Sequence, residues 1–261
     1  MRLPMYQVDA FTDSLFGGNP AAVCPLDAWL PDATMQAIAA ENNLAETAFF
    51  VRDGSDYALR WFTPTVEVDL CGHATLASGH VVFSFLEPKR DSVRFHTAKA
   101  GTLTVGRRGD RLVMDFPAWP AEPCEPPAGL LAALGGTPRA VLRARDHLVV
   151  YDTAAAITAL EPDLAALGKV ESWAAIVTAP GGNGIDFVSR FFAPAQGVPE
   201  DPVTGSAHCT LVPYWAKRLG KTQFEARQLS RRGGALRCAL NGDRVSIGGQ
   251  AVTYLEGRIE V

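Results

Sequence analysis

Glycines that recur at one fixed spacing show that this chain repeats itself. Three pairs of glycines are each 133 residues apart: Gly72 and Gly205, Gly101 and Gly234, and Gly109 and Gly242. Their surroundings repeat too, since Arg60–Pro64 resembles Arg190–Pro194. The chain has 261 residues, so two such copies account for nearly all of it. We therefore expect two similar lobes with a cleft between them, because ligand sites occur preferentially between domains.

The boundary between the copies falls in a proline-rich segment. Residues 117 to 127 contain five prolines, which is typical of a linker. We predict an N-terminal lobe over residues 1–118 and a C-terminal lobe over 119–261, with the last strand as a candidate for return to the first lobe. Hydrophobic residues make up 48% of the chain, enough for a core in each lobe.

Charge and cysteine content narrow the class of protein. A net charge of -4 gives no general attraction to nucleic acid or to anionic membranes. The five cysteines are scattered without the spacing of metal ligands. The chain shows neither a signal peptide nor an apolar run of transmembrane length. We expect a cytoplasmic protein with free thiols, no metal site and no nucleic-acid or membrane partner.

Strand and helix patterns are mixed along both copies. Residues 31–43 carry apolar side chains at helical spacing, with Asp32 or Thr34 available as an N-cap. Residues 47–62 predict a hairpin around an Asp-Gly-Ser-Asp turn. In the second copy, residues 153–167 form an alanine- and leucine-rich helical stretch. These patterns indicate an α+β protein.

The segments after the first repeated glycine pair predict a central helix in each lobe. Residues 73–83 and 206–215 are small and apolar on nearly every side, which is typical of a helix buried within its domain. Pro213 is expected to kink the second helix. A sheet wrapped around one helix fits this pattern. The N–H groups at both helix starts would then be available to bind a carboxylate.

Polar residues at these helix starts are candidates for a site. Asp201 and Ser206 are common helix caps, but their place at a repeated helix start also fits a role in a site. His73 follows Gly72 at the other helix start. Cys71 would have a lowered pKa at a helix N-terminus. Its counterpart in the second copy is Thr204, so a symmetric pair of catalytic thiols is absent and a structural role for Cys71 is favoured.

Glu46 is the candidate general acid/base. It lies between a predicted helix and an apolar strand, and the second copy offers only Glu171, which is out of step. A carboxylate entering an apolar strand is expected to be partly buried with a raised pKa, which suits proton transfer. A solvated glutamate at a strand end is the alternative interpretation.

Several motifs together resemble the phenazine-biosynthesis PhzF-like family from end to end. They are Val8–Phe11, Gly18–Pro20, Asn43–Phe49, Arg60–Pro64, Asp69–Thr75 and Glu200–Ala207. The resemblance implies the diaminopimelate-epimerase-like fold: two lobes from an internal duplication, each a β-barrel-like sheet around a central helix, in a homodimer.

The resemblance also implies an activity. The family's best-characterised reaction is a cofactor-free isomerisation of a cyclic dihydro-hydroxyanthranilate, which requires no metal, flavin or nicotinamide. By resemblance, Glu46 is the general acid/base, and His73, Asp201 and Ser206 surround the substrate and assist proton movement. The helix-start residues Gly72, Gly205 and Thr204 are expected to bind the substrate, with the glycine amides holding its carboxylate.

Two other functions remain open from the sequence. The first is an amino-acid epimerase or a hydroxyproline-type dehydratase, which would use Cys71 as its base. The second is a ligand-binding protein that retains the fold without turnover. The titratable and hydroxyl groups described above exceed what holding a carboxylate requires, so the binding protein ranks last. The leading hypothesis, which follows from the resemblance, is an isomerase that shifts a proton on a small, cyclic carboxylate.

Overall fold

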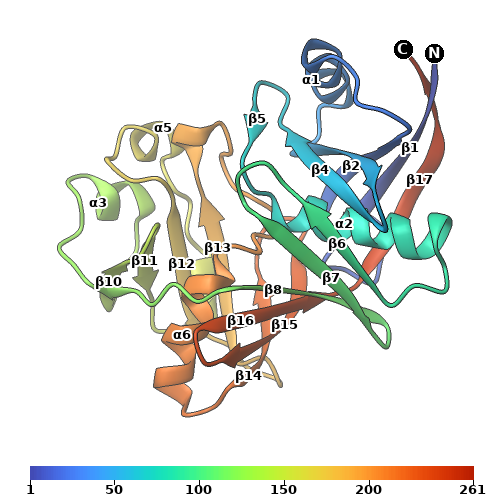
Figure 1. Cartoon of the computed structure of the whole chain (residues 1–261). Coiled ribbons are helices and arrows are strands. Elements are labelled where there is room, and N and C mark those ends of the chain that lie inside the picture. Colours follow the sequence, from blue (N-terminus) through green and yellow to red (C-terminus); the bar gives the residue numbers. More distant parts are fainter. The chain divides into compact units, whose positions relative to one another are not determined.

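The computed structural model describes residues 1–261 and divides into two compact units (Figure 1). The first unit comprises Met1–Asp115 together with Gly248–Val261, and the second comprises Phe116–Ile247. The C-terminal strand β17 (Ala251–Glu260) belongs to the first unit, where it pairs antiparallel with β1 (Arg2–Ala10). None of the helices is both long and apolar enough to cross a membrane.

The first unit is built mainly of strands around one buried helix. Its remaining strands are β2 (Asn19–Leu26), β3 (Glu46–Asp53), β4 (Asp56–Phe62), β5 (Glu67–Val68), β6 (Ser92–His96), β7 (Thr102–Arg108) and β8 (Arg111–Pro117). Its helices are α1 (Asp32–Asn42), α2 (Gly72–Val81) and the π-helix η1 (Val82–Leu86). The predicted hairpin is confirmed, because β3 and β4 pair antiparallel with Thr47 opposite Phe62.

The second unit follows the same plan. Its strands are β9 (Glu122–Pro123), β10 (Ala140–Arg143), β11 (His147–Val150), β12 (Ala175–Pro180), β13 (Phe187–Phe192), β14 (Gln223–Gln228), β15 (Gly234–Asn241) and β16 (Arg244–Gly249), the last of which leads back to the first unit. Its helices are α3 (Leu130–Leu134), α4 (Ala154–Thr158), α5 (Leu164–Leu167), the short 3-10 helix η2 (Pro194–Gln196) and α6 (His208–Leu219).

Strand pairing repeats the duplication seen in the sequence. In the first unit, β1–β2 is antiparallel, β2–β3 parallel, β3–β4 antiparallel, β4–β6 parallel and β6–β7 antiparallel. In the second unit, β10–β11, β11–β12, β12–β13, β13–β14 and β14–β15 show the same alternation in the same order. The internal duplication is therefore present in the topology.

Helix α2 is the central element of the first unit. It contacts β1, β2, β3 and β7, so strands surround it on several sides. All of its residues except Gly72 and His80 are buried. The prediction of a buried central helix from its all-round apolar sequence is confirmed.

Helix α6 differs from the prediction at its start. It begins at His208, not at Ser206, and the preceding turn is held by i to i−3 bonds such as His208 N–H to the Gly205 carbonyl. Pro213 lies inside the helix, which continues to Leu219. The Cys209 carbonyl, which Pro213 cannot bond, accepts the backbone N–H of Trp119 at 2.8 Å. This outside donor explains why the proline does not end the helix.

Two other local predictions are wrong. The N-cap of α1 is Pro31, which makes no side-chain cap bond, and Asp32 instead receives a hydrogen bond from Arg60. The stretch over residues 153–167 forms two short helices, α4 and α5. Pro162 lies between them, and the Thr153 and Asp163 side chains cap them separately. The proline cannot donate the hydrogen bond that a continuous helix needs.

Candidate active site

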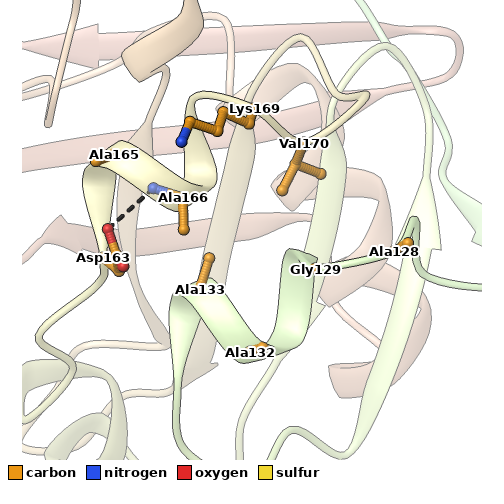
Figure 2. Close-up of a pocket in the computed structure, with 9 residues that line it drawn as sticks. All are labelled: Ala128, Gly129, Ala132, Ala133, Asp163, Ala165, Ala166, Lys169 and Val170. Carbon is orange, nitrogen blue, oxygen red and sulfur yellow. Dashed lines mark hydrogen bonds between the residues drawn. The ribbon is translucent and has the colours of Figure 1, made fainter.

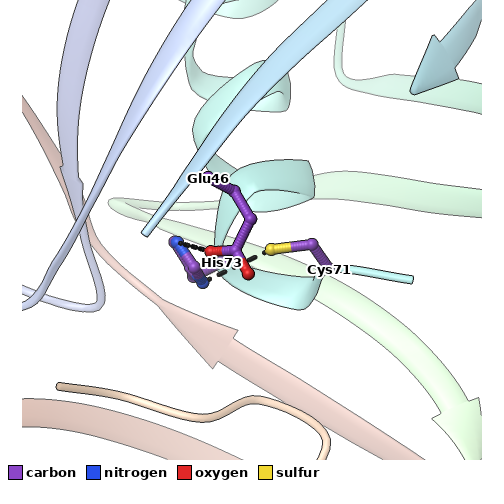
Figure 3. Close-up of side chains that lie close together, drawn as sticks. All are labelled: Glu46, Cys71 and His73. Carbon is purple, nitrogen blue, oxygen red and sulfur yellow. Dashed lines mark hydrogen bonds and ion pairs between the residues drawn. The ribbon is translucent and has the colours of Figure 1, made fainter. Parts of the chain in front are cut away.

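Three chemically reactive side chains of the first unit meet at the start of α2 (Figure 3). Glu46 is the first residue of β3, Cys71 immediately precedes α2, and His73 is the second residue of α2. The Glu46 Oε2 atom lies 3.2 Å from His73 Nε2, and Cys71 Sγ lies 3.5 Å from His73 Nδ1. We refer to these three residues as the Glu46 cluster.

The Glu46 cluster is shielded from solvent. The side chain of Glu46 is 16% exposed and that of His73 is 6% exposed, while Cys71 is buried. The sequence-based prediction that Glu46 is partly buried is thus confirmed. Burial in a low-dielectric environment strengthens electrostatic and hydrogen-bond interactions within such a cluster.

His73 is neutral at physiological pH. Burial lowers the pKa of its imidazole to about 3, and a hydrogen bond to the Pro20 backbone raises it only in part. Proline has no N–H, so the imidazole donates this bond to the carbonyl. The ring nitrogen Nε2 faces the Glu46 carboxyl group, with 3.2 Å between Nε2 and Oε2.

The start of β2 supports His73 and was not assigned a role from the sequence. The fully buried Asn19 places its Nδ2 atom 3.2 Å from His73 Nδ1. The preceding Gly18 has φ +62, and a Cβ atom there would lie 2.1 Å from the Ala10 carbonyl oxygen. Only glycine fits this position. In the sequence, the Gly-Asn-Pro motif was the only sign of this role. The structure shows that its Asn19 and Pro20 contact His73.

In the second unit, Asp201 and Thr204 belong to one hydrogen-bonded group. The Thr204 hydroxyl donates to Asp201 Oδ2 at 2.5 Å. Gln228 accepts from the Thr204 backbone N–H at 2.8 Å and donates to the Asp201 carbonyl at 2.7 Å. We call these three residues the Thr204 group. It fixes the loop before α6.

Ser206 has a different neighbour. Arg145 Nη2 lies 3.4 Å from Ser206 Oγ, and the guanidinium is held by the carboxylate of Asp146. Its Cζ atom lies 5.0 Å from the centroid of the Trp119 ring. Arg145 was missed from the sequence, where it stands among several arginines with nothing to distinguish it. It provides a positive charge beside Ser206.

The structure brings together some of the predicted site residues. Glu46 and His73 are in contact in the first unit, with Gly72 as the first residue of α2. Asp201 and Thr204 are in contact in the second unit. Gly205 precedes α6 by three residues, so it lies in the turn before the helix and is not its first residue. The catalytic and binding roles of all these residues remain predictions.

A surface cavity of the second unit contains none of the predicted residues (Figure 2). It has a volume of about 470 Å³ and lies at α3 and α5, where alanines form most of its wall. Its carboxylate, Asp163, accepts the Ala166 N–H at 2.9 Å as the cap of α5. The carboxylate of this cavity therefore serves the local helix.

The sequence and the fold are similar to those of several known proteins, some of which are named as isomerases. The family model described as phenazine biosynthesis-like protein matches residues 8–257. An uncharacterized isomerase of Pseudomonas aeruginosa is 55% identical over 261 residues, covering 100% of both chains. The crystal structure of a PhzF family protein of Enterococcus faecalis covers 100% of both chains with 44% identity and a TM-score of 0.97.

A more distant structure extends the likeness at the level of fold alone. A hydroxyproline epimerase of Agrobacterium vitis, solved with trans-4-hydroxy-L-proline, aligns with 99% of this chain and 92% of its own. Its TM-score is 0.59 at 12% identity. The predicted family and epimerase-like fold are confirmed.

Proposed function

Because this chain belongs to the phenazine biosynthesis-like family, we propose that it is an isomerase that moves a proton on a small, cyclic carboxylate, with Glu46 as the acid/base. The isomerase class rests on the named relatives. The base and the substrate class are our own assignment. The observation that carries it is the 3.2 Å approach of Glu46 Oε2 to a neutral imidazole nitrogen in a buried cluster.

In this proposal His73 assists Glu46 by holding its proton. The Glu46 carboxylate removes a proton from a substrate carbon and becomes a carboxylic acid. Its O–H then donates to Nε2 of His73, 3.2 Å away, in the tautomer that carries the ring proton on Nδ1, and this bond stabilises the protonated form. Glu46 finally returns the proton to another carbon on the same face of the substrate. A base that becomes the acid in this way works best with a pKa near the working pH.

The start of α2 is the proposed binding site for the substrate carboxylate. The first N–H groups of an α-helix have no partner within the helix and carry partial positive charge. Gly72 and His73 supply these groups next to the Glu46 cluster. A carboxylate bound there would place the neighbouring ring carbons near Glu46. Asp201, Thr204 and Ser206 keep their predicted roles in substrate binding and proton movement.

The test is deuterium uptake from heavy water into a panel of substrates, followed by mass spectrometry. The panel contains dihydro-hydroxyanthranilate, diaminopimelate, proline and 3-hydroxyproline. Glu46→Gln should abolish uptake while the protein remains folded, because the amide cannot accept the proton. Glu41→Gln, an exposed change on α1, is the matched control and should retain full uptake. Normal uptake with Glu46→Gln on an identified substrate would refute the assignment.

A second candidate function uses Cys71. Its Sγ atom lies 3.5 Å from His73 Nδ1, so a thiol and an imidazole are also neighbours in the cluster. A thiol-dependent epimerase or dehydratase would remove the proton with Cys71. Loss of uptake with Cys71→Ser and retention with Glu46→Gln would favour it. Against it, the matched hydroxyl of Thr204 is already donated to Asp201.

A further inference from the structure

We propose that the Glu46 cluster also binds a zinc ion, and that zinc thereby inhibits the isomerase. The three side chains each offer a ligand atom, and these atoms lie within 4.8 Å of one another. Carboxylate, thiolate and imidazole are the ligand types that zinc uses in proteins. The inhibitory consequence rests on the proposed function, whereas binding itself rests on the cluster alone.

The geometry approaches that of a zinc site with three protein ligands. Zinc bonds of about 2.0–2.3 Å place neighbouring tetrahedral ligands roughly 3.3–3.6 Å apart. The separation of 3.2 Å between Glu46 Oε2 and His73 Nε2 already matches this spacing. Cys71 Sγ lies 3.5 Å from the other ring nitrogen, Nδ1, so the thiol has to move toward the Nε2 side of the ring to bind the same ion. As the residue before α2, with extended φ and ψ of -139 and 114, it can do so by rotating its side chain.

His73 is prepared for a metal by its other contacts. A metal-binding histidine commonly donates its second ring N–H to a backbone carbonyl, which fixes its orientation and tautomer. Here His73 hydrogen-bonds the Pro20 backbone, which holds the ring in place. One ring nitrogen faces Glu46 and the other faces Cys71 (Figure 3).

Charge balance favours a divalent ion at this buried position. On binding, Cys71 releases its thiol proton to solvent and coordinates as a thiolate, while Glu46 coordinates as a carboxylate. Two negative ligands and a neutral imidazole cancel the double charge of zinc, so the filled site carries no net charge. The thiolate and imidazole favour zinc over the hard ions magnesium and calcium. With Glu46 coordinated, the proposed base is blocked.

Cobalt titration tests binding directly. Co²⁺ added to the metal-free protein under reducing conditions should give the visible bands of tetrahedral cobalt and a near-ultraviolet thiolate-to-cobalt band, both removed by excess Zn²⁺. Cys71→Ser and His73→Gln should each weaken binding by at least about 100-fold, the upper end of the range for removing even an outer-shell partner. Cys124→Ser, which removes a half-buried cysteine outside the cluster, should leave the spectrum unchanged.

The outcomes separate this proposal from the proposed function. Absence of a thiolate band in the wild type, or its persistence in Cys71→Ser, would overturn the zinc site whatever the enzyme does. Circular dichroism must show that each variant is folded, and Glu46→Gln with retained thiolate absorption but weaker binding gives independent support. Deuterium uptake that proceeds unaltered with saturating zinc would refute inhibition. Zinc binding without uptake on any substrate would leave the site standing and the isomerase assignment unsupported.

Discussion

The chain enters the central helices of the two units, α2 and α6, through matching segments of the sequence repeat, but these segments carry different side chains. In the first unit, the Cys71–His73 segment enters α2 directly, and Thr75 N–H already bonds the Cys71 carbonyl at 3.2 Å. In the second, the Thr204–Ser206 segment forms a tighter turn before α6. The first segment carries a thiol and an imidazole beside a carboxylate, and the second carries hydroxyls bonded to Asp201 and near Arg145. The two copies therefore share their strand order but differ in the reactive side chains at the helix starts.

One ion pair occurs at matching positions of the two copies, Arg60–Glu67 in the first unit and Arg190–Glu200 in the second. Arg60 makes two hydrogen bonds to Glu67, both 2.7 Å, and Arg190 makes two to Glu200, of 2.7 and 3.1 Å. Each arginine also lies over a phenylalanine of its own strand, with Cζ 5.2 and 4.9 Å from the ring centroid. Positions that hold the fold were therefore retained in both copies, unlike the helix starts.

Exchanging the divergent residue should have the largest effect. His73→Ser installs the second unit's residue in the first and removes the imidazole beside Glu46. We expect the rate of deuterium uptake to fall about 1000-fold, within the range for general acid/base groups. Ser206→Ala should cost clearly less, because Glu46 keeps its imidazole neighbour in this variant. Equal losses in both variants, measured on one substrate, would mean that the two helix starts contribute alike.

The conserved ion pairs should differ in their effect on stability. Arg190 is 12% exposed and also donates to the Ile157 and Leu160 carbonyls, whereas Arg60 is 22% exposed. Arg190→Met should lower the free energy of unfolding by about 3 kcal/mol, because it leaves a half-buried carboxylate and two carbonyls without their donor. Arg60→Met should cost about 1 kcal/mol, since its partners are more exposed. Urea unfolding of both variants checks this order.

The features of the fold and of the candidate site that could be predicted from the sequence are those that depend on residues close together in the chain. The glycine spacing and the apolar pattern of residues 73–83 predicted the duplication and the buried helix α2, because both follow from local patterns. The family motifs pointed to Glu46 and His73, which the structure places in contact.

The features that were missed depend on contacts between distant residues. Asn19 is 54 residues from His73, and Arg145 is 61 residues from Ser206. The Glu46 cluster likewise combines three residue types from two elements, and cysteine spacing alone does not reveal such a grouping. Local propensity contains no information about such contacts, so they emerge only when the chain is folded.

Each unit should also lose stability in acid, because burial or partial burial lowers histidine pKa values in both units. Burial lowers the pKa of His80 in the first unit and of His208 in the second to about 4. The unfolded chain, with a pKa of about 6.5, binds these protons first, so stability falls as pH drops from 6.5 toward 4. Each histidine should contribute a loss of about 2 kcal/mol by pH 5. His80→Gln and His208→Gln should each flatten the dependence of unfolding free energy on pH, and an unchanged slope would contradict the assignment for that residue.

The smallest effect is expected at the proline that distinguishes α6 from α2. Pro213→Ala restores an N–H that could bond the Cys209 carbonyl, but Trp119 N–H already occupies that carbonyl at 2.8 Å. The new N–H must share the acceptor, so the usual gain of about 3 kcal/mol from removing a helix proline should shrink to less than about 1 kcal/mol. Urea unfolding of the variant measures the change. A gain of the full amount of about 3 kcal/mol would mean that the Trp119 bond contributes little and that Pro213 strains the helix. The proline in α6 would then lower the stability of the second unit.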